Sequence, residues 1–164
     1  MVQRRTLPID GYRGRAVPNT LFKRGEWTGH LAIVFPDLHY ASSAPLFHFT
    51  RKLLLEEGAD VLAVDFDYTS NARYASLSEV DKQRWFLDDV IATWETAALY
   101  HPVERLTLAA KSLGTLAVAH LLHERKLPEN TEIIWITPPL EAPSMQDELL
   151  FLLVLCPTIN NKLF

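Results

Sequence analysis

The chain has 164 residues, of which 48% are hydrophobic, and this is enough for one domain with a substantial core. Its formal net charge of −4 and its scattered Lys and Arg residues exclude the basic face of a nucleic-acid-binding domain. No apolar run reaches the roughly 18 residues that span a bilayer, and the N-terminus lacks the apolar core of a signal peptide. The single cysteine, Cys156, excludes an internal disulfide and suits a reducing compartment. We therefore expect one cytoplasmic domain, residues 1–164, with neither nucleic acid nor membrane as a partner.

Short apolar runs in the sequence predict the strands. The first 28 residues contain Gly11, Gly14 and two prolines, which favour a short hairpin or edge segment. Four apolar, β-rich runs follow, at 30–35, 59–66, 104–110 and 131–137. They are typical of strands that are covered on both faces, as in a parallel sheet. A fifth apolar run, 149–157, is compatible with a helix end, a strand, or both.

Helices with recognisable ends lie between these runs. The first follows Ser42 and Ser43, with Pro45 suited to its first turn and Gly58 to its C-terminal cap. The second begins after Ser78 and ends before Pro102. Its apolar residues form one stripe, consisting of Leu87, Val90, Ile91, Trp94 and Ala98. A third runs from about Leu113 to Lys126, and Ser144 with Asp147 resembles a capping box that opens a fourth.

The alternation of strands and helices predicts the fold class. Strand, helix, strand and helix in this order predict an α/β fold with a mostly parallel, doubly wound sheet and helices on both faces. Ligands of such sheets bind beyond the carboxyl ends of the strands. Three turns lie at that edge, at 36–40, 65–69 and 111–114. We therefore expect the functional site among these turns.

The stretch LTLAAKSLGTLAVAHLL, residues 106–122, contains the strongest chemical signal. A strand that turns within one residue into a helix strains the turning residue and needs small residues two positions before and after it. Ala110 and Gly114 flank Ser112 in this way. The Ser112 hydroxyl would project above the sheet, and the Leu113 amide would form half of an oxyanion hole. The alternative is a serine that caps the helix.

Four stretches, GYRGRAVPNTLF, VFPDLHY, LLLEEGADVLAVDFDY and LTLAAKSLGTLA, together resemble the α/β-hydrolase superfamily. They look like its small bacterial members with a Gly-Lys-Ser-Leu-Gly-Thr nucleophile elbow, over roughly Ile9 to Leu140. The resemblance implies that Ser112 is the nucleophile and that the Leu113 amide binds the oxyanion. It also implies a second amide donor after the first parallel strand, Leu38 or, failing that, Asp37. The substrate would be a small ester or similar acyl compound.

The sequence departs from this superfamily pattern at several positions. Ala110 replaces the first elbow glycine, and Asp37 and His39 stand where relatives usually have glycines. A carboxylate aimed at a developing oxyanion would oppose catalysis. The histidine that should activate Ser112 is also missing. The only histidines after Ser112 are His120 and His123, and a rise of about 1.5 Å per residue places them roughly 12 Å or more down the helix.

Two substitutes for the missing triad residues can be named. His39 lies at the correct end of the sheet and could approach Ser112 from an unusual direction. Glu141 follows the strand at 131–137 and is the candidate acid, with a solvated loop residue as its alternative interpretation. Relatives continue beyond the run at 149–157, so we expect a shortened or frameshifted hydrolase, or one whose incomplete sheet is covered by self-association. Two hypotheses remain, a serine hydrolase of small esters and a truncated or degenerate hydrolase that binds a ligand or partner without catalysis.

We predict no metal and no cofactor. The stretch HLLHE, 120–124, inverts the order of zinc motifs, and an amphipathic helix explains it better. Asp65 and Asp67 supply too few carboxylates for a Mg²⁺ or Ca²⁺ site. The turn after the first parallel strand, FPDLHY, has no glycine with which to bind a nucleotide.

Overall fold

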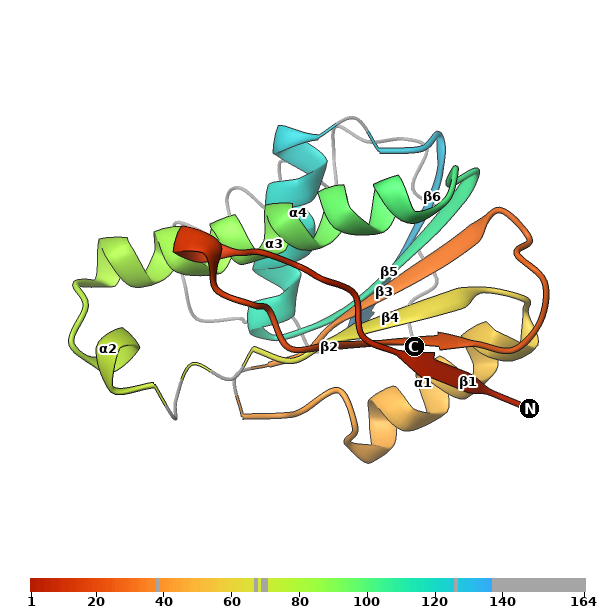
Figure 1. Cartoon of the computed structure of the whole chain (residues 1–164), viewed down its shortest axis with the longest axis horizontal. Coiled ribbons are helices and arrows are strands. Elements are labelled where there is room, and N and C mark those ends of the chain that lie inside the picture. Colours follow the sequence, from red (N-terminus) through yellow and green to blue (C-terminus); the bar gives the residue numbers. More distant parts are fainter. Residues whose placement is uncertain (38, 67, 69–70, 126, 137–164) are drawn as a thin grey trace.

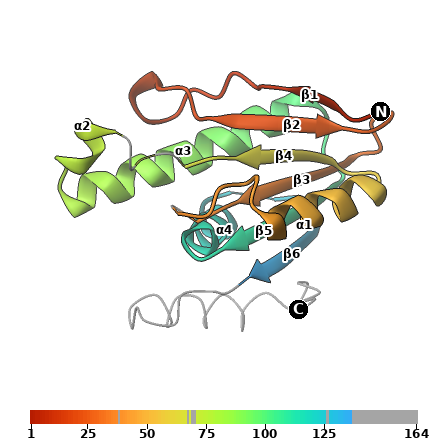
Figure 2. The ribbon, with the colours of Figure 1, turned by 90° about the horizontal axis from the view of Figure 1, so that it is seen from below.

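The protein is described by a computed structural model that covers residues 1–37, 39–66, 68, 71–125 and 127–136. These residues form one six-stranded sheet with the strand order β1-β2-β4-β3-β5-β6, which Figure 2 shows from below. The strands are β1 (Gln3–Arg5), β2 (Asn19–Lys23), β3 (His30–Phe35), β4 (Asp60–Val64), β5 (Arg105–Lys111) and β6 (Asn130–Ile136). The strands β4, β3, β5 and β6 pair in parallel, whereas β1 and β2 are antiparallel.

Helices cover both faces of the sheet (Figure 1). They are α1 (Pro45–Glu56), α2 (Ala72–Ala75), α3 (Glu79–Tyr100) and α4 (Leu113–Glu124), with a short 3-10 turn, η1 (Tyr12–Gly14), near the N-terminus. The helices α3 and α4 lie on one face and α1 on the other. The predicted α/β class, with a mostly parallel sheet between helices, is therefore confirmed.

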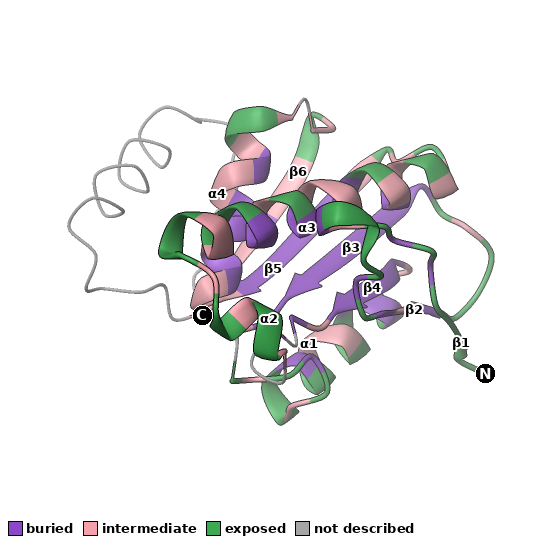
Figure 3. Ribbon diagram, turned by 60° about the vertical axis from the view of Figure 1, so that its left-hand side comes forward, coloured by how far each residue is buried: buried purple, intermediate pink, exposed green. Residues whose placement is uncertain are grey.

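The core lies on both sides of the central strands, where all residues of β3 and β4 are buried (Figure 3). Side chains alternate between the faces of a strand. Along β3, Leu31, Ile33 and Phe35 belong to the apolar cluster under α3 and α4. The intervening Ala32 and Val34 belong to the cluster under α1. The runs at 30–35, 59–66 and 104–110 thus form buried strands of a parallel array, whereas β6, from the fourth run, is mostly only partly buried.

The ends of the first two predicted helices are confirmed. Pro45 is the first residue of α1, and Gly58, with a φ of +87°, adopts the left-handed conformation that follows a helix end. The Ser78 hydroxyl accepts a hydrogen bond of 3.2 Å from the Asp81 amide and caps α3. The run at 149–157 and the helix expected after Ser144 lie outside the described residues. Within those residues, no helix is both long enough and apolar enough to cross a bilayer.

The buried line of α3 differs from the predicted stripe. Val90 and Trp94 are buried, but the other members of that stripe, Leu87, Ile91 and Ala98, are only partly buried. The buried line also includes Trp85, Phe86, Asp89, Thr93 and Ala97. The reason is that η1 packs on α3, where Tyr12 stacks on Trp85 at 4.8 Å between ring centroids. This N-terminal cover buries a helix face that the apolar periodicity did not indicate.

Candidate active site

Ser112 lies between the end of β5 and the first residue of α4. Its φ of 49° and ψ of −115° are unusual for a residue with a side chain. Within the described residues, Arg13 is the one other non-glycine residue with a positive φ. Such a conformation costs of order 1–3 kcal/mol and persists only when the surrounding structure enforces it. The strained turn predicted at Ser112 is therefore present.

The alternative role of Ser112 as a helix cap is not observed. Ser112 occupies the N-cap position, but its side chain makes no capping hydrogen bond. An N-cap serine normally has extended backbone angles and accepts a bond from an amide in the first turn. Here the Ser112 carbonyl accepts two bonds instead, from the Thr115 amide at 2.8 Å and from the Thr115 hydroxyl at 2.6 Å. The half-buried Ser112 hydroxyl therefore does not stabilise the start of α4 by capping it.

The small residues on both sides of Ser112 allow α4 to begin against β3. Ala110 is fully buried and pairs in register with Phe35. A Cβ added at Gly114 would collide with the Phe35 carbonyl oxygen and would lie 2.7 Å from its carbonyl carbon. The absence of a side chain at Gly114 is thus a packing requirement of this turn.

The Leu113 amide is the first backbone N–H of α4. The first four amides of a helix have no intrahelical acceptor, and the helix dipole adds positive potential there. The arrangement can therefore stabilise an anion beside Ser112. Leu38, the predicted second donor, lies outside the described residues, as does Glu141. Asp37 and His39 flank Leu38, with Asp37 half-buried and His39 exposed.

The turn after β3 is closed by a hydrogen bond of 3.3 Å from the Tyr40 amide to the Asp37 carbonyl. Lys111, the last residue of β5, extends toward this turn. Its Nζ lies 4.0 Å from Asp37 Oδ2 and 5.1 Å from the centre of the Tyr40 ring. The Asp37 carboxylate, which the sequence suggested would oppose an oxyanion, thus has a cation beside it. Lys111 and Tyr40 were not among the predicted site residues, although a cation and an aromatic residue near the ends of two strands could have indicated this contact.

No hydrogen bond joins a histidine to Ser112 within the part of the chain that the structure describes. His30 is buried at the start of β3, where its Nε2 lies 2.9 Å from Thr107 Oγ1. His123 Nδ1 lies 2.7 Å from Glu124 Oε1 on the exposed end of α4. His120 and His123 both lie on α4, as expected, and neither is hydrogen-bonded to Ser112.

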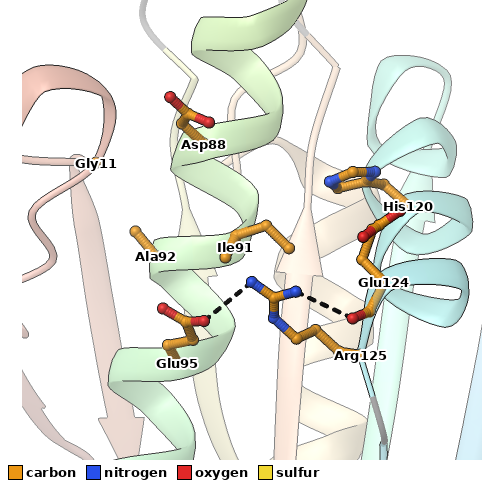
Figure 4. A pocket seen from close by; sticks show the side chains of 8 residues that line it. All are labelled: Gly11, Asp88, Ile91, Ala92, Glu95, His120, Glu124 and Arg125. Atoms are coloured by element: carbon orange, nitrogen blue, oxygen red, sulfur yellow. Dashed lines mark hydrogen bonds and ion pairs between the residues drawn. The ribbon is translucent and has the colours of Figure 1, made fainter.

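A groove of about 340 Å³ lies between α3 and α4 (Figure 4). His120 lines it, and burial is the main cause that lowers the pKa of this imidazole. Arg125 bridges the two helices because its Nη2 donates to Glu95 Oε1 at 3.0 Å. None of the lining residues belongs to the turns at Ser112 or Asp37. The groove is therefore a separate feature from the candidate active site. Among the described residues, no cluster of three or more His, Cys, Asp or Glu side chains could hold a metal ion.

Asp65, one of the two aspartates considered for a metal, has a structural role at the end of β4. Its Oδ1 accepts the Ser42 amide at 2.8 Å, and its Oδ2 accepts the Ser42 hydroxyl at 3.0 Å. These bonds fasten the segment that precedes α1 to the carboxyl edge of the sheet. Ser42 therefore binds Asp65 rather than capping α1, whose cap position is Ala44.

Solved structures share this arrangement of strands and helices. The Pyrococcus furiosus esterase Pf2001 matches with a TM-score of 0.65 and 18% identity, over 86% of this chain and 52% of that protein. A cold-adapted esterase from an Arctic intertidal metagenomic library matches with a TM-score of 0.60 and 18% identity, over 80% of this chain and 60% of that one. This chain has the α/β-hydrolase fold. An Agrobacterium tumefaciens protein of unknown function, provisionally assigned to the α/β hydrolases, shares this fold at 19% identity and a TM-score of 0.57, over 79% and 58% of the two chains.

The solved structures support the α/β-hydrolase fold that the sequence resemblance implied. No protein-family model matches the sequence, and no curated protein matches it either. The chain spans about half the length of Pf2001, since the match covers 52% of that esterase.

Proposed function

We propose that this α/β-hydrolase-fold chain is a serine hydrolase of small esters or similar acyl compounds, with Ser112 as the nucleophile. The observation that carries the proposal is the backbone of Ser112, which has a φ of 49° on a one-residue turn from β5 into α4. Its hydroxyl is not used to cap that helix. Two proteins that share the fold are esterases, which supports the same class of substrate. The single cysteine supports a cytoplasmic location as part of this proposal.

The proposed reaction has two acyl-transfer steps. Ser112 Oγ bonds to the acyl carbon, the carbon–oxygen bond to the leaving alcohol breaks, and that alcohol takes up the serine proton. Water then cleaves the acyl-serine, which releases the acid and restores the hydroxyl. The Leu113 amide and a second amide, from Leu38 or Asp37, stabilise the oxyanion in both steps. His39 is the candidate base on the turn after β3, and Glu141 is the candidate acid.

A second candidate function is ligand or partner binding without catalysis. It is favoured by one observation, that within the described residues no histidine is hydrogen-bonded to Ser112. A serine without a positioned base is a weak nucleophile. The strained turn would then keep the shape of a catalytic site that no longer turns over.

Hydrolysis of p-nitrophenyl acetate and butyrate separates these two candidates. The serine-hydrolase proposal predicts turnover by the wild type that Ser112→Ala abolishes while the thermal midpoint stays the same. His39→Gln is a matched test of the candidate base and should lower kcat by roughly 100-fold. Equal rates for the wild type and Ser112→Ala would contradict the proposal and favour the non-catalytic candidate.

A further inference from the structure

We propose that Lys111 is a positioning residue, which holds the turn between Asp37 and Tyr40 against the carboxyl end of β5. The second oxyanion donor of the proposed function belongs to this turn, so the position of the turn would affect the reaction. The inference rests on the proposed serine-hydrolase function, and it assigns to that reaction a residue outside the nucleophile and its amides.

The sheet register brings Lys111 to this turn. The strands β3 and β5 are parallel neighbours, and Phe35 pairs with Ala110. The chain therefore leaves both strands at the same level, into the turn at Asp37 on one side and into Ser112 on the other. Side chains alternate along β5, where Ala109 packs in the cluster under α1 and Ala110 in the opposite cluster. Lys111 consequently lies on the α1 side of the sheet, and Tyr40 packs against that same cluster.

Lys111 makes two contacts with the turn. Its Nζ lies 4.0 Å from Asp37 Oδ2 and 5.1 Å from the centre of the Tyr40 ring. Its side chain is 21% exposed and that of Asp37 is 25% exposed, so water screens their attraction less than it would at the open surface. A cation over an aromatic ring adds a second, independent attraction.

The turn is also attached to α1, through Tyr40. The Tyr40 hydroxyl oxygen accepts the Leu46 amide at 3.2 Å, in the first turn of that helix. The Tyr40 ring meets Phe47 edge-on, with 5.9 Å between ring centroids. Because Tyr40 is fixed to α1, a contact from Lys111 can set the distance between the turn and β5.

Two effects follow from this arrangement, and both favour the transition state. Lys111 keeps the turn close to Ser112, and it offsets part of the negative charge that Asp37 brings to the turn. Loss of the lysine side chain would remove both contacts and loosen the turn. Misplacement of a catalytic donor by a small distance is enough to lower a rate severely.

Covalent labelling by a fluorophosphonate measures the effect on catalysis. In this step the bond from Ser112 Oγ to phosphorus forms, the phosphorus–fluorine bond breaks, fluoride leaves and the hydroxyl proton passes to the buffer. We expect Lys111→Met to lower the maximal inactivation rate about tenfold, with less change in the half-saturating probe concentration. Lys111→Arg should restore most of the rate, and Lys111→Met should cost less in an Asp37→Asn background. Lys52→Met, at an exposed position on α1, is the matched control and should label like the wild type.

Amide hydrogen exchange tests the same contact without catalysis. Lys111→Met should speed exchange of the Tyr40 amide, and neither Lys111→Arg nor Lys52→Met should do so. Unchanged exchange and unchanged inactivation in Lys111→Met would overturn the inference. An equal rate loss in Lys111→Met and Lys111→Arg, with equally lowered thermal midpoints, would overturn it in favour of a general structural role. A wild type that the probe never labels, but whose Tyr40 exchange depends on Lys111, would contradict the proposed function while the positioning contact stands.

Discussion

Ser112 and Asp89 are two polar residues whose surroundings differ in burial, backbone conformation and hydrogen bonding. Ser112 is half-buried, has a φ of 49° and makes no capping bond with its side chain. Asp89 is 4% exposed on the regular helix α3, and its oxygens accept bonds of 2.7 Å each from the Tyr12 amide and the Tyr68 hydroxyl. A buried polar group with its bonds satisfied holds a fold together. A strained polar group that is free of such bonds is a candidate for chemistry.

Asp89 joins parts of the chain that are distant in sequence. It connects the segment around Tyr12 and the segment after β4 that contains Tyr68 to helix α3. Burial raises the pKa of its carboxyl, and the hydrogen bond from the Tyr12 amide is the main opposing influence. Gly11 must lack a side chain because a Cβ there would collide with Asp89 Oδ1. The N-terminal segment is therefore attached through a buried carboxylate.

The largest loss of stability is expected from Gly114→Ala, which would break the close approach at the Ser112 turn. The added methyl group would collide with the Phe35 carbonyl, and neither backbone can move without shifting a central strand. We expect the free energy of unfolding to fall by about 3 kcal/mol or more. Urea denaturation measures this loss of stability. Gly25→Ala is the matched control, because a Cβ at Gly25 meets nothing within 4 Å. Equal losses for the two variants would show that packing at Gly114 is not tight.

Asp89→Ala should have the next largest effect, because it leaves two buried donors without an acceptor. The expected loss is about 2–4 kcal/mol in the free energy of unfolding. Asp89→Asn keeps one acceptor oxygen and should lose less. Neither variant should change fluorophosphonate labelling of the folded protein. If Asp89→Ala destroyed labelling but not stability, the contrast between a structural Asp89 and a reactive Ser112 would be wrong.

Much of this molecule could be predicted from its sequence, because local patterns determine local structure. The strands β3 to β6 come from mostly apolar runs, and α1 and α3 have a proline or serine at the start. The strain at Ser112 was predicted from its small neighbours together with its position between a buried strand and a helix. The antiparallel attachment of β2 to β4 did not follow, since strand pairing across the sheet leaves no period in the sequence.

Interactions between distant segments were the part that could not be predicted. A charged residue on a helix is normally solvated, so Asp89 gave no sign that η1 and Tyr68 would cover it. The contact of Lys111 with Asp37 depends on the parallel register of β3 and β5, which sequence spacing does not reveal. Leu38 and Glu141, predicted from family resemblance, lie outside the described residues and stay predictions.

Ser112→Gly should have a smaller effect, and of opposite sign. Glycine tolerates a positive φ, so the substitution removes strain, although it also increases the freedom of the unfolded chain. We expect a net gain of about 1 kcal/mol in the free energy of unfolding, together with complete loss of labelling. Both variants lack the hydroxyl, so the difference between their urea denaturation curves measures the cost of the positive φ. Identical stabilities would show that the turn stores no strain.

The smallest effect is expected at His30, where burial, followed by the charge of Arg105, lowers the imidazole pKa from its usual value of 6.5. Glu132 and Glu57 oppose this shift. Because the unfolded chain binds the proton more readily, His30 contributes stability above pH 6.5 that is lost as the pH falls through its lowered pKa. Unfolding free energies at pH 8, 7, 6 and 5 should therefore fall more steeply for the wild type than for His30→Gln. Parallel curves would contradict this expectation.

The central claim, that Ser112 is the nucleophile, is tested most directly by mass spectrometry of the intact chain after fluorophosphonate treatment. We expect one adduct on the wild type, located by fragmentation to Ser112, and none on Ser112→Ala under the same conditions. An unmodified wild type, or an adduct that persists in Ser112→Ala, would contradict it.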